Sequence, residues 1–120
     1  MLEFGKINKL GDDLVYYVPQ TSVKEDLLQW YNDSLQFPYF GYNWDSLYDL
    51  LCDLHWIRER HVWLRHEEVP NLDKQELAIY LETISSAADS WQMDDRHVLH
   101  VSFPEIYNGK LDNTEQSTKR

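Results

Sequence analysis

Residues 37–53 read FPYFGYNWDSLYDLLCD and combine a loop signal with a helix signal. Pro38, Gly41 and Asn43 are typical of a loop, and the Asn43 side chain is well suited to cap the helix that follows. From Trp44 to Leu54, apolar residues recur at i, i+3, i+4 and i+7, which predicts a helix with one buried face. The residues of this face are Leu47, Leu50, Leu51 and Leu54.

A second face of the same predicted helix is acidic, because Asp45, Asp49 and Asp53 fall at i, i+4 and i+8. Like charges at i, i+4 destabilise a helix by roughly 0.2–0.5 kcal/mol per pair. One interpretation is a solvated surface. Acids surrounded by aromatic residues, however, favour a surface that docks a cationic protein. The aromatic residues here are Phe37, Tyr39, Phe40, Tyr42, Trp44 and Tyr48.

The segment YFGYNWDSLYDLL resembles the signature of the barstar family, small acidic inhibitors of extracellular bacterial ribonucleases. In that family an aromatic-aromatic-Gly-x-Asn-x-Asp-x-Leu-x-Asp run forms the enzyme-binding loop and helix. The matching positions are Tyr39, Phe40, Gly41, Asn43, Asp45, Leu47 and Asp49. The order of predicted elements extends the likeness over residues 12–103.

The resemblance implies roles for the matching residues. The Asp49 carboxylate is expected to enter the ribonuclease active site and replace an RNA phosphate, held by charge-assisted hydrogen bonds. Asp45 is expected to make a second acidic contact, and Tyr39 an aromatic contact by stacking on a catalytic imidazole. Asn43 and Gly41 are expected to shape the loop, with Gly41 at a backbone angle that other residues resist.

Further residues complete the predicted partner-binding surface. Trp44 is expected to widen the aromatic contact, with Tyr48 and Asp53 beside it. The family also has an acid on its last long helix, which falls near Ser86 in one alignment and at Glu82 if the helix is shifted by one turn. The predicted surface consists of Tyr39, Asn43, Trp44, Asp45, Tyr48, Asp49, Asp53 and Glu82.

The length and charge of the chain limit the kinds of protein it can be. We expect the 120 residues to form a single domain over positions 1–120. The 21 acidic and 11 basic residues give a formal net charge of -10, which disfavours nucleic-acid binding through phosphates and favours a basic protein partner. Cys52 is the single cysteine, so an internal disulfide is excluded. The lack of a signal-like or membrane-spanning apolar run leads us to expect a cytoplasmic protein.

The remaining sequence predicts alternating strands and helices. Strands are expected at residues 13–18, 61–67 and 97–103, and helices at 22–35, 44–54 and 74–90. Thr21 or Ser22 is expected to cap the first helix, since Ser22 and Glu25 have capping-box spacing, and Asp73 or Asn71 the last. Helical crossovers favour parallel pairing. The predicted fold is therefore α/β, a small three-stranded parallel sheet packed with helices, which agrees with the barstar family.

The ends of the chain carry weaker signals. No element is predicted for residues 1–11. The ordered core is expected to span residues 12–103, followed by a polar tail at 105–120 whose last eight or so residues are mobile.

The sequence offers little for catalysis or for metal binding. The four glycines are isolated rather than gathered in a phosphate-binding loop, and RHEE at residues 65–68 lacks the second histidine of a zinc motif. His97 and His100 point to opposite faces of a strand. The three helix carboxylates would spread over about 12 Å, which suits a single cation poorly. We therefore predict no catalytic residue, no metal and no cofactor.

Three functions are weighed from these observations. The first is a monomeric inhibitor that binds a basic bacterial ribonuclease one to one; because the family includes immunity proteins encoded beside toxins, the target could be a ribonuclease toxin. The second is an acidic adaptor or regulatory protein with a non-enzymatic basic partner. The third, a hydrolase using paired carboxylates, predicts a deep cleft around Asp45 and Asp49.

Overall fold

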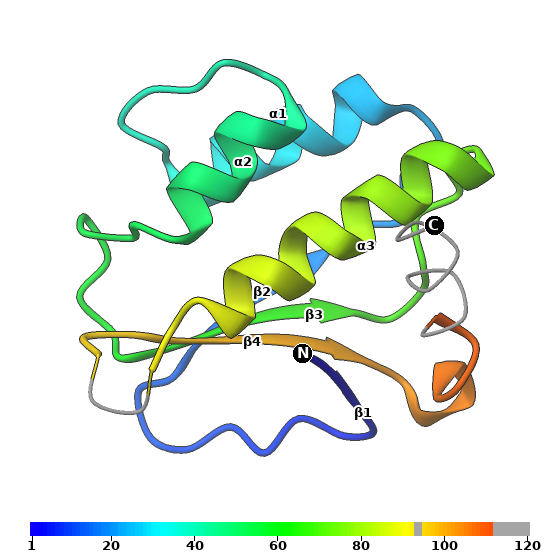
Figure 1. Ribbon diagram of the computed structural model, residues 1–120. Helices are drawn as coiled ribbons and strands as arrows, with labels where there is room; N and C mark the ends of the chain where they lie inside the picture. The colour runs from blue at the N-terminus through cyan, green and yellow to red at the C-terminus, as the bar shows by residue number, and fades with distance from the viewer. Residues whose placement is uncertain (93–94, 112–120) are drawn as a thin grey trace.

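The computed structural model describes residues 1–92 and 95–111, which form a parallel sheet with three helices on one face (Figure 1). In chain order the elements are β1 (Leu2–Phe4), β2 (Leu14–Val18), α1 (Lys24–Leu35), α2 (Trp44–Leu51), β3 (His61–His66), α3 (Lys74–Asp89), β4 (Val98–Phe103) and the 3-10 helix η1 (Glu105–Tyr107).

The sheet has four parallel strands in the order β1-β4-β3-β2. The predicted α/β fold with a parallel sheet is confirmed, and the three expected strands are β2, β3 and β4. The predicted strand count is wrong, because β1 adds a fourth strand. Three residues are too few for an alternating pattern to be visible in the sequence. β1 is instead defined by its partner β4, where Leu2 pairs with Val101 and Phe4 with Phe103.

The route of the chain explains why the helices share one face. The chain steps from β2 to β3 and then to β4 in one direction across the sheet, and right-handed connections place their helices on the same side. From β1 the chain must return across the whole sheet to reach β2, so a right-handed connection has to cross the opposite face. Residues 5–13, here called the strap, take this path along the helix-free side of the sheet (Figure 1).

The core lies between the helices and the sheet. The predicted leucine face is fully buried, as Leu47, Leu50, Leu51 and Leu54 all have 0% exposure. These side chains pack with apolar residues of β3 and β4 such as Leu64 and Val101. Burial of apolar surface stabilises the folded protein by about 25 cal/mol per Å², and this burial holds α2 on the sheet.

A hydrogen-bonded chain of polar side chains crosses this core. The hydroxyls of Tyr31 and Tyr80 are 2.7 Å apart, and the Tyr80 hydroxyl is 2.7 Å from His66 Nε2. His66 Nδ1 lies 3.3 Å from the Ser102 carbonyl, which only accepts, so Nδ1 donates and Nε2 accepts from Tyr80. Burial lowers the pKa of His66 to about 3 and raises the pKa of both tyrosines. All three side chains are therefore neutral.

The predicted cap of the first helix is wrong. Val23 is the last residue before α1 and makes no side-chain cap, so Ser22 and Glu25 form no capping box. Val23 is extended, as the residue before a helix normally is, and its carbonyl accepts from Asp26 N at 3.1 Å, so the helix begins one residue later than predicted. At α3 the predicted Asp73 cap is confirmed, since its side chain accepts from the backbone of the first turn.

The second helix ends earlier than predicted. α2 stops at Leu51, and the N–H groups of Asp53 and Leu54 both donate to the Leu50 carbonyl. Leu54 then has a left-handed backbone with a φ of 50°. The helical spacing of leucines in the sequence continues to Leu54, beyond the end of the helix, because the turn after α2 still directs the Leu54 side chain into the core.

Beyond β4, the described chain continues through η1 to Leu111, which is buried. The mobility predicted for the last eight or so residues concerns positions outside the described residues. No helix in the described part of the chain is both long and apolar enough to cross a membrane.

Candidate functional site

The loop of residues 36–43 joins α1 to α2 and contains two left-handed residues. Gln36 has a φ of 53° and Tyr42 a φ of 54°. Positive φ is uncommon outside glycine, and such strain persists where the surroundings impose it. The Tyr42 ring contacts that of Phe40, with centroids 4.8 Å apart, and its hydroxyl accepts a hydrogen bond from Asn32 Nδ2 at 3.1 Å. These contacts hold the strained residue.

Gly41 serves the loop in a different way from the one predicted. The expected left-handed angle at Gly41 is wrong, because the neighbouring Tyr42 adopts it instead. A Cβ at Gly41 would lie 3.4 Å from both Ser46 Cβ and Asn43 Nδ2, which is at the limit of ordinary van der Waals contact. The Gly41 N–H donates to Ser46 Oγ at 2.9 Å. Asn43 Oδ1 accepts from Ser46 N at 2.7 Å, which confirms the predicted cap.

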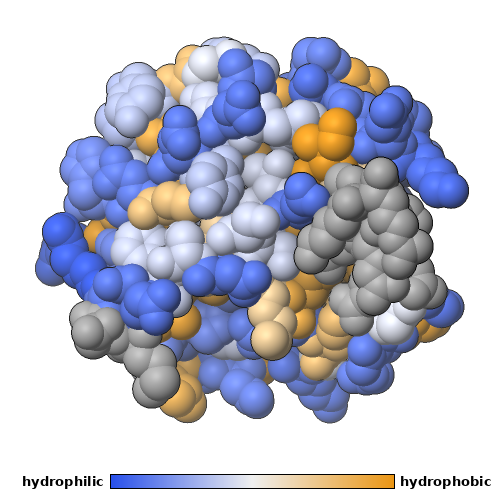
Figure 2. Space-filling model, viewed as in Figure 1, coloured by the Kyte–Doolittle hydropathy of each residue, from blue (hydrophilic) through white to orange (hydrophobic). Residues whose placement is uncertain are grey.

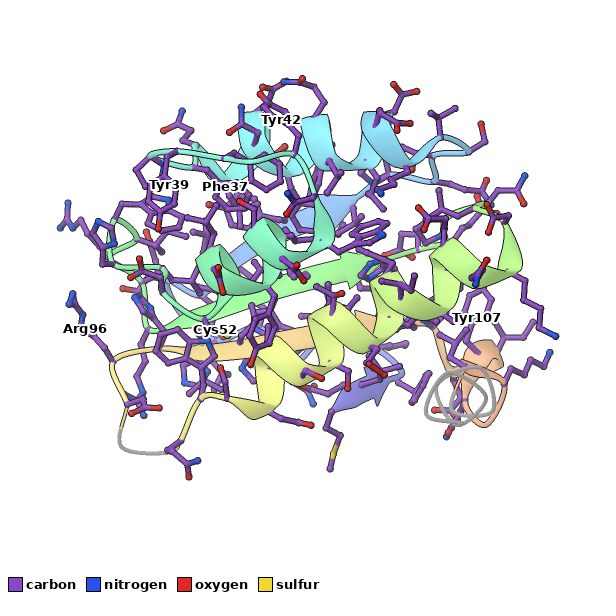
Figure 3. The ribbon with its side chains drawn as sticks, turned by 45° about the horizontal axis from the view of Figure 1, so that its top comes forward. Phe37, Tyr39, Tyr42, Cys52, Arg96 and Tyr107 are labelled. Atoms are coloured by element: carbon purple, nitrogen blue, oxygen red, sulfur yellow. The ribbon has the colours of Figure 1, made fainter. Side chains whose placement is uncertain are left out.

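The loop is anchored by aromatic packing on its inner side. Phe37 is 8% exposed, and its ring centroid lies 5.0 Å from that of Phe40 and 5.7 Å from that of Trp56. Trp56 Nε1 donates to the Leu35 carbonyl at 2.7 Å. Tyr39 is 62% exposed and projects from the loop (Figure 3). The anchored loop therefore leaves the Tyr39 ring largely exposed to solvent.

The acidic face of α2 carries two aspartates. Asp45 lies in the first turn, where the helix N-terminus favours negative charge, and Asp49 follows one turn later. Both are exposed, and residues four apart share a helix face. Asp53 lies beyond α2 and its carboxylate oxygens are 3.0 Å from His55 Nδ1. The predicted row of three acids on one helix is therefore reduced to two.

Trp44 is mostly covered by the rest of the protein. It is 8% exposed, its ring centroid lies 5.7 Å from that of Tyr80, and Lys24 Nζ lies over the ring at 5.4 Å from its centroid. Trp44 reaches the surface where it lines a cleft. Its contact with a partner stays a prediction.

That cleft, about 290 Å³ in volume, lies where α2 and α3 meet. Its lining residues are Trp44, Asp45, Tyr48, Glu82, Thr83 and Ser86. Both candidates for the third acidic contact, Glu82 and Ser86, thus face the same space one helical turn apart, and Glu82 supplies a carboxylate to it. Figure 2 shows that this side of the molecule is mainly hydrophilic, with scattered apolar patches. Thr83 was not predicted, although its i, i+3 spacing to Ser86 could have placed it on this face.

Tyr48 stands between the acidic face and the cleft and is 38% exposed. A hydrogen bond with the Cys52 side chain, at the end of α2 (Figure 3), raises the pKa of Tyr48, and the charge of Asp49 adds to this increase. Tyr48 is therefore a neutral phenol at physiological pH. It offers a ring and a hydroxyl beside two carboxylates.

The described residues contain no group of three or more His, Cys, Asp or Glu side chains arranged to hold a metal ion. Asp45 lines the cleft between α2 and α3 but Asp49 does not, and both are exposed, so the two carboxylates do not share the deep cleft that the hydrolase hypothesis required. The arrangement suits recognition of cations by acidic and aromatic side chains.

Comparison with known proteins points in the same direction. A family model described as Barstar (barnase inhibitor) matches residues 18–103, which include α1, the loop, α2, β3, α3 and β4. No curated protein and no solved structure matches the chain. Because the family match covers more than half of the 120 residues, the chain belongs to the Barstar (barnase inhibitor) family.

Proposed function

We propose that this protein inhibits a basic bacterial ribonuclease by covering its active site with α2 and the preceding loop. Membership of the barstar family supports a ribonuclease inhibitor as the general class. The observation that carries the specific proposal is the pair Asp45 and Asp49, exposed on one face of α2 beside a cleft that no basic side chain lines.

The two carboxylates would imitate the phosphates of RNA. Asp49 and Asp45 each offer two oxygens to arginine, lysine or protonated histidine, and charge-assisted hydrogen bonds of this kind are strong. A ribonuclease active site must hold cationic groups to bind a phosphate chain. An acidic protein can therefore compete with RNA for the same groups.

The surface is pre-organised, which lowers the ordering cost of binding. Asn43 caps α2, and Ser46 Oγ accepts a hydrogen bond from the Gly41 N–H. The buried Phe37 ring packs against Phe40 on the inner side of the loop. Tyr39 remains exposed for stacking on a flat group of the partner, such as a catalytic imidazole. Little of this surface would need to change on binding.

The cleft between α2 and α3 extends the proposed contact. Glu82 adds a carboxylate opposite Asp45, and Tyr48 adds an aromatic wall. A guanidinium of the partner could pair with a carboxylate while stacking on the ring. Trp44 and Asp53 are the remaining members of the proposed surface. Trp44 is mostly buried beneath it, and Asp53 lies beyond the end of α2.

The proposed partner is a ribonuclease or a ribonuclease toxin domain with a basic active site, bound one to one by a monomeric inhibitor in the cytoplasm. A gene for such a domain beside the gene for this chain would identify the target. The formal charge of -10 supports a basic partner by long-range attraction.

Co-expression with a growth-arresting basic ribonuclease tests the proposal. The unchanged protein is expected to restore growth, and Asp49→Ala to abolish the rescue while the circular dichroism spectrum stays native. The helix should lose no stability, because the substitution removes a like-charge pair worth roughly 0.2–0.5 kcal/mol.

Asp12→Ala is the matched control, since Asp12 is an exposed acid in the strap on the opposite side of the sheet. It removes the same charge and is expected to keep the rescue. Binding of the ribonuclease without loss of its activity would favour the adaptor hypothesis. Unfolding of Asp49→Ala would show that the acid is structural.

A further inference from the structure

Tyr42 is an exposed aromatic residue that the proposed partner-binding surface does not include. Three of the large apolar side chains exposed in the described part of the chain, Tyr39, Tyr42 and Tyr48, fall within residues 39–48. Tyr39 and Tyr48 already belong to the proposed surface. Tyr42 is 48% exposed and lies just before α2, on the α1 side of the loop (Figure 3).

The backbone at this position does not suit a tyrosine. Tyr42 has a φ of 54°, in the left-handed region, where a residue with a Cβ pays a steric cost that glycine avoids and asparagine tolerates. If only the turn mattered, either of these residues would form it more easily. Strain of this kind gathers at functional sites, and here the strained residue is also the exposed one.

The Tyr42 ring is held in place before any partner arrives. Its centroid lies 4.8 Å from that of Phe40, which in turn lies 5.0 Å from that of the buried Phe37. At the other end of the side chain, the Tyr42 hydroxyl accepts a hydrogen bond from Asn32 Nδ2 on α1 at 3.1 Å. Such a ring loses little rotamer freedom on binding, which is why fixed tyrosines are effective contact residues.

The hydroxyl of Tyr42 also has a hydrogen to donate. A phenol carries one O–H donor and two acceptor lone pairs, and the bond from Asn32 uses a lone pair. The residues that the structure describes supply no acceptor for the Tyr42 O–H. The side chain therefore offers a partner both an apolar ring and a hydrogen-bond donor.

The size of a stable interface requires more residues than the proposed surface contains. A protein–protein interface of standard size buries about 800 Å² on each partner, supplied by about 20–30 residues. Toward α3 the surface continues into the cleft with Thr83 and Ser86. Toward α1 the adjoining exposed aromatic side chain is Tyr42, with Asn32 behind it.

We propose that Tyr42 contacts the ribonuclease beside its active site, with its ring packed on the enzyme surface and its hydroxyl donating to an oxygen of the enzyme. This inference rests on the proposed function, because it requires the enzyme to be bound by α2. It extends the interface from α2 toward α1. Since the contact adds no charge, it slows dissociation rather than speeding association.

Tyr42→Asn tests the contact, because asparagine adopts the left-handed backbone without the ring. The probe is the basic ribonuclease that the unchanged protein neutralises in co-expression, with both rates measured by surface plasmon resonance. The dissociation rate is expected to rise about tenfold, the loss of a contact of moderate strength. The association rate should stay within about twofold, and the melting temperature within about 5 °C.

Two conservative variants separate the partner contact from the internal hydrogen bond. Tyr42→Phe keeps the ring and removes the hydroxyl, so the dissociation rate is expected to rise about two- to tenfold, the effect of one hydrogen bond. Asn32→Ala removes the internal bond but leaves the phenol able to donate. It is expected to dissociate within about twofold of the unchanged protein.

Tyr17→Asn is the matched control. Tyr17 is 61% exposed and lies on the edge strand β2. Because Val18 points into the core, the neighbouring Tyr17 points to the helix-free face of the sheet. The same substitution at this position is expected to leave both rates unchanged.

Asp49→Ala, measured with the same enzyme, distinguishes failure of this inference from failure of the proposed function. If Asp49→Ala loses binding while both Tyr42 variants dissociate at the unchanged rate, the Tyr42 contact is wrong and the proposed function stands. Equal acceleration by Tyr42→Phe and Asn32→Ala would also overturn the contact, because the internal bond would then explain the effect. If Asp49→Ala binds normally, or no ribonuclease is neutralised, the proposed function fails and the contact fails with it.

Discussion

His66 links the deepest part of the core to the pH of the solution. It is fully buried, accepts a hydrogen bond from Tyr80 and donates one to the Ser102 carbonyl. Protonation of Nε2 would force the hydrogen bond with Tyr80 to reverse its direction and would place a charge in an apolar environment. Burial therefore lowers the pKa of His66 from 6.5 to about 3.

We predict that stability falls as the pH falls from 6.5 to about 3. In this window the unfolded chain binds a proton at His66 and the folded protein does not, so acid favours unfolding by up to about 1.4 kcal/mol per pH unit. Urea unfolding at a series of pH values measures the slope. His66→Gln should be less stable at neutral pH but should show a shallower slope, and an equal slope would contradict the prediction.

Tyr42 shows how strain enters the candidate site. Its left-handed backbone costs of order 1–3 kcal/mol, which the ring contact with Phe40 and the bond from Asn32 help to offset. In return, the chain turns sharply from the aromatic loop into α2. The adjacent Asn43 is then placed to cap the helix that presents the acids.

At the scale of elements, α2 and α3 both begin with a side-chain N-cap. Asn43 accepts from Ser46 N at 2.7 Å, and Asp73 accepts from Glu76 N at 2.9 Å. A side-chain cap of this kind contributes about 1 kcal/mol. Only the first of these caps belongs to the proposed partner-binding surface.

We therefore predict that Asn43→Ala and Asp73→Ala each lower the free energy of unfolding by about 1 kcal/mol, as measured by urea denaturation. Asn43→Ala should also weaken binding of the ribonuclease, because the first turn of α2 carries Asp45. Asp73→Ala is the matched control and should bind normally under conditions where both variants are folded. Equal binding by both would show that the cap does not position the acids.

The elements that could be predicted are those specified by nearby residues. Sequence patterns that span only a few neighbouring residues specify three of the features: the leucine spacing of α2, the caps at Asn43 and Asp73, and the three longer strands. The capping box at Ser22 failed because α1 begins at Lys24, which leaves Val23 and not Ser22 at the capping position. β1 was missed because its three residues become a strand only beside β4.

The same distinction applies to the candidate site. The positions of Asp45 and Asp49 on one helix face follow from their spacing, and the motif singled out Tyr39. The cleft with Glu82 and Thr83 arises from the packing of α2 against α3, which no local pattern contains. The end of α2 before Asp53 was missed because Leu54 stays buried after the helix has ended.

At the scale of the whole molecule, the net charge of -10 attracts a basic partner electrostatically over longer distances than any single residue contact. Ions screen such attraction beyond a Debye length of about 10 Å at 0.1 M salt. We predict that the association rate with a basic ribonuclease falls at least about tenfold between about 0.02 M and about 0.5 M salt, while the dissociation rate changes much less. Stopped-flow fluorescence measures both rates, and an association rate insensitive to salt would argue against electrostatic attraction.

The pairing of β1 with β4 also has a consequence for synthesis of the chain. Residues 2–4 meet their partners only after residues 101–103 have been made. At ribosomal speeds of about 5–20 residues per second, that interval lasts on the order of 5–20 s. The edge strand β1 is therefore the first strand to be translated and among the last to be built into the sheet.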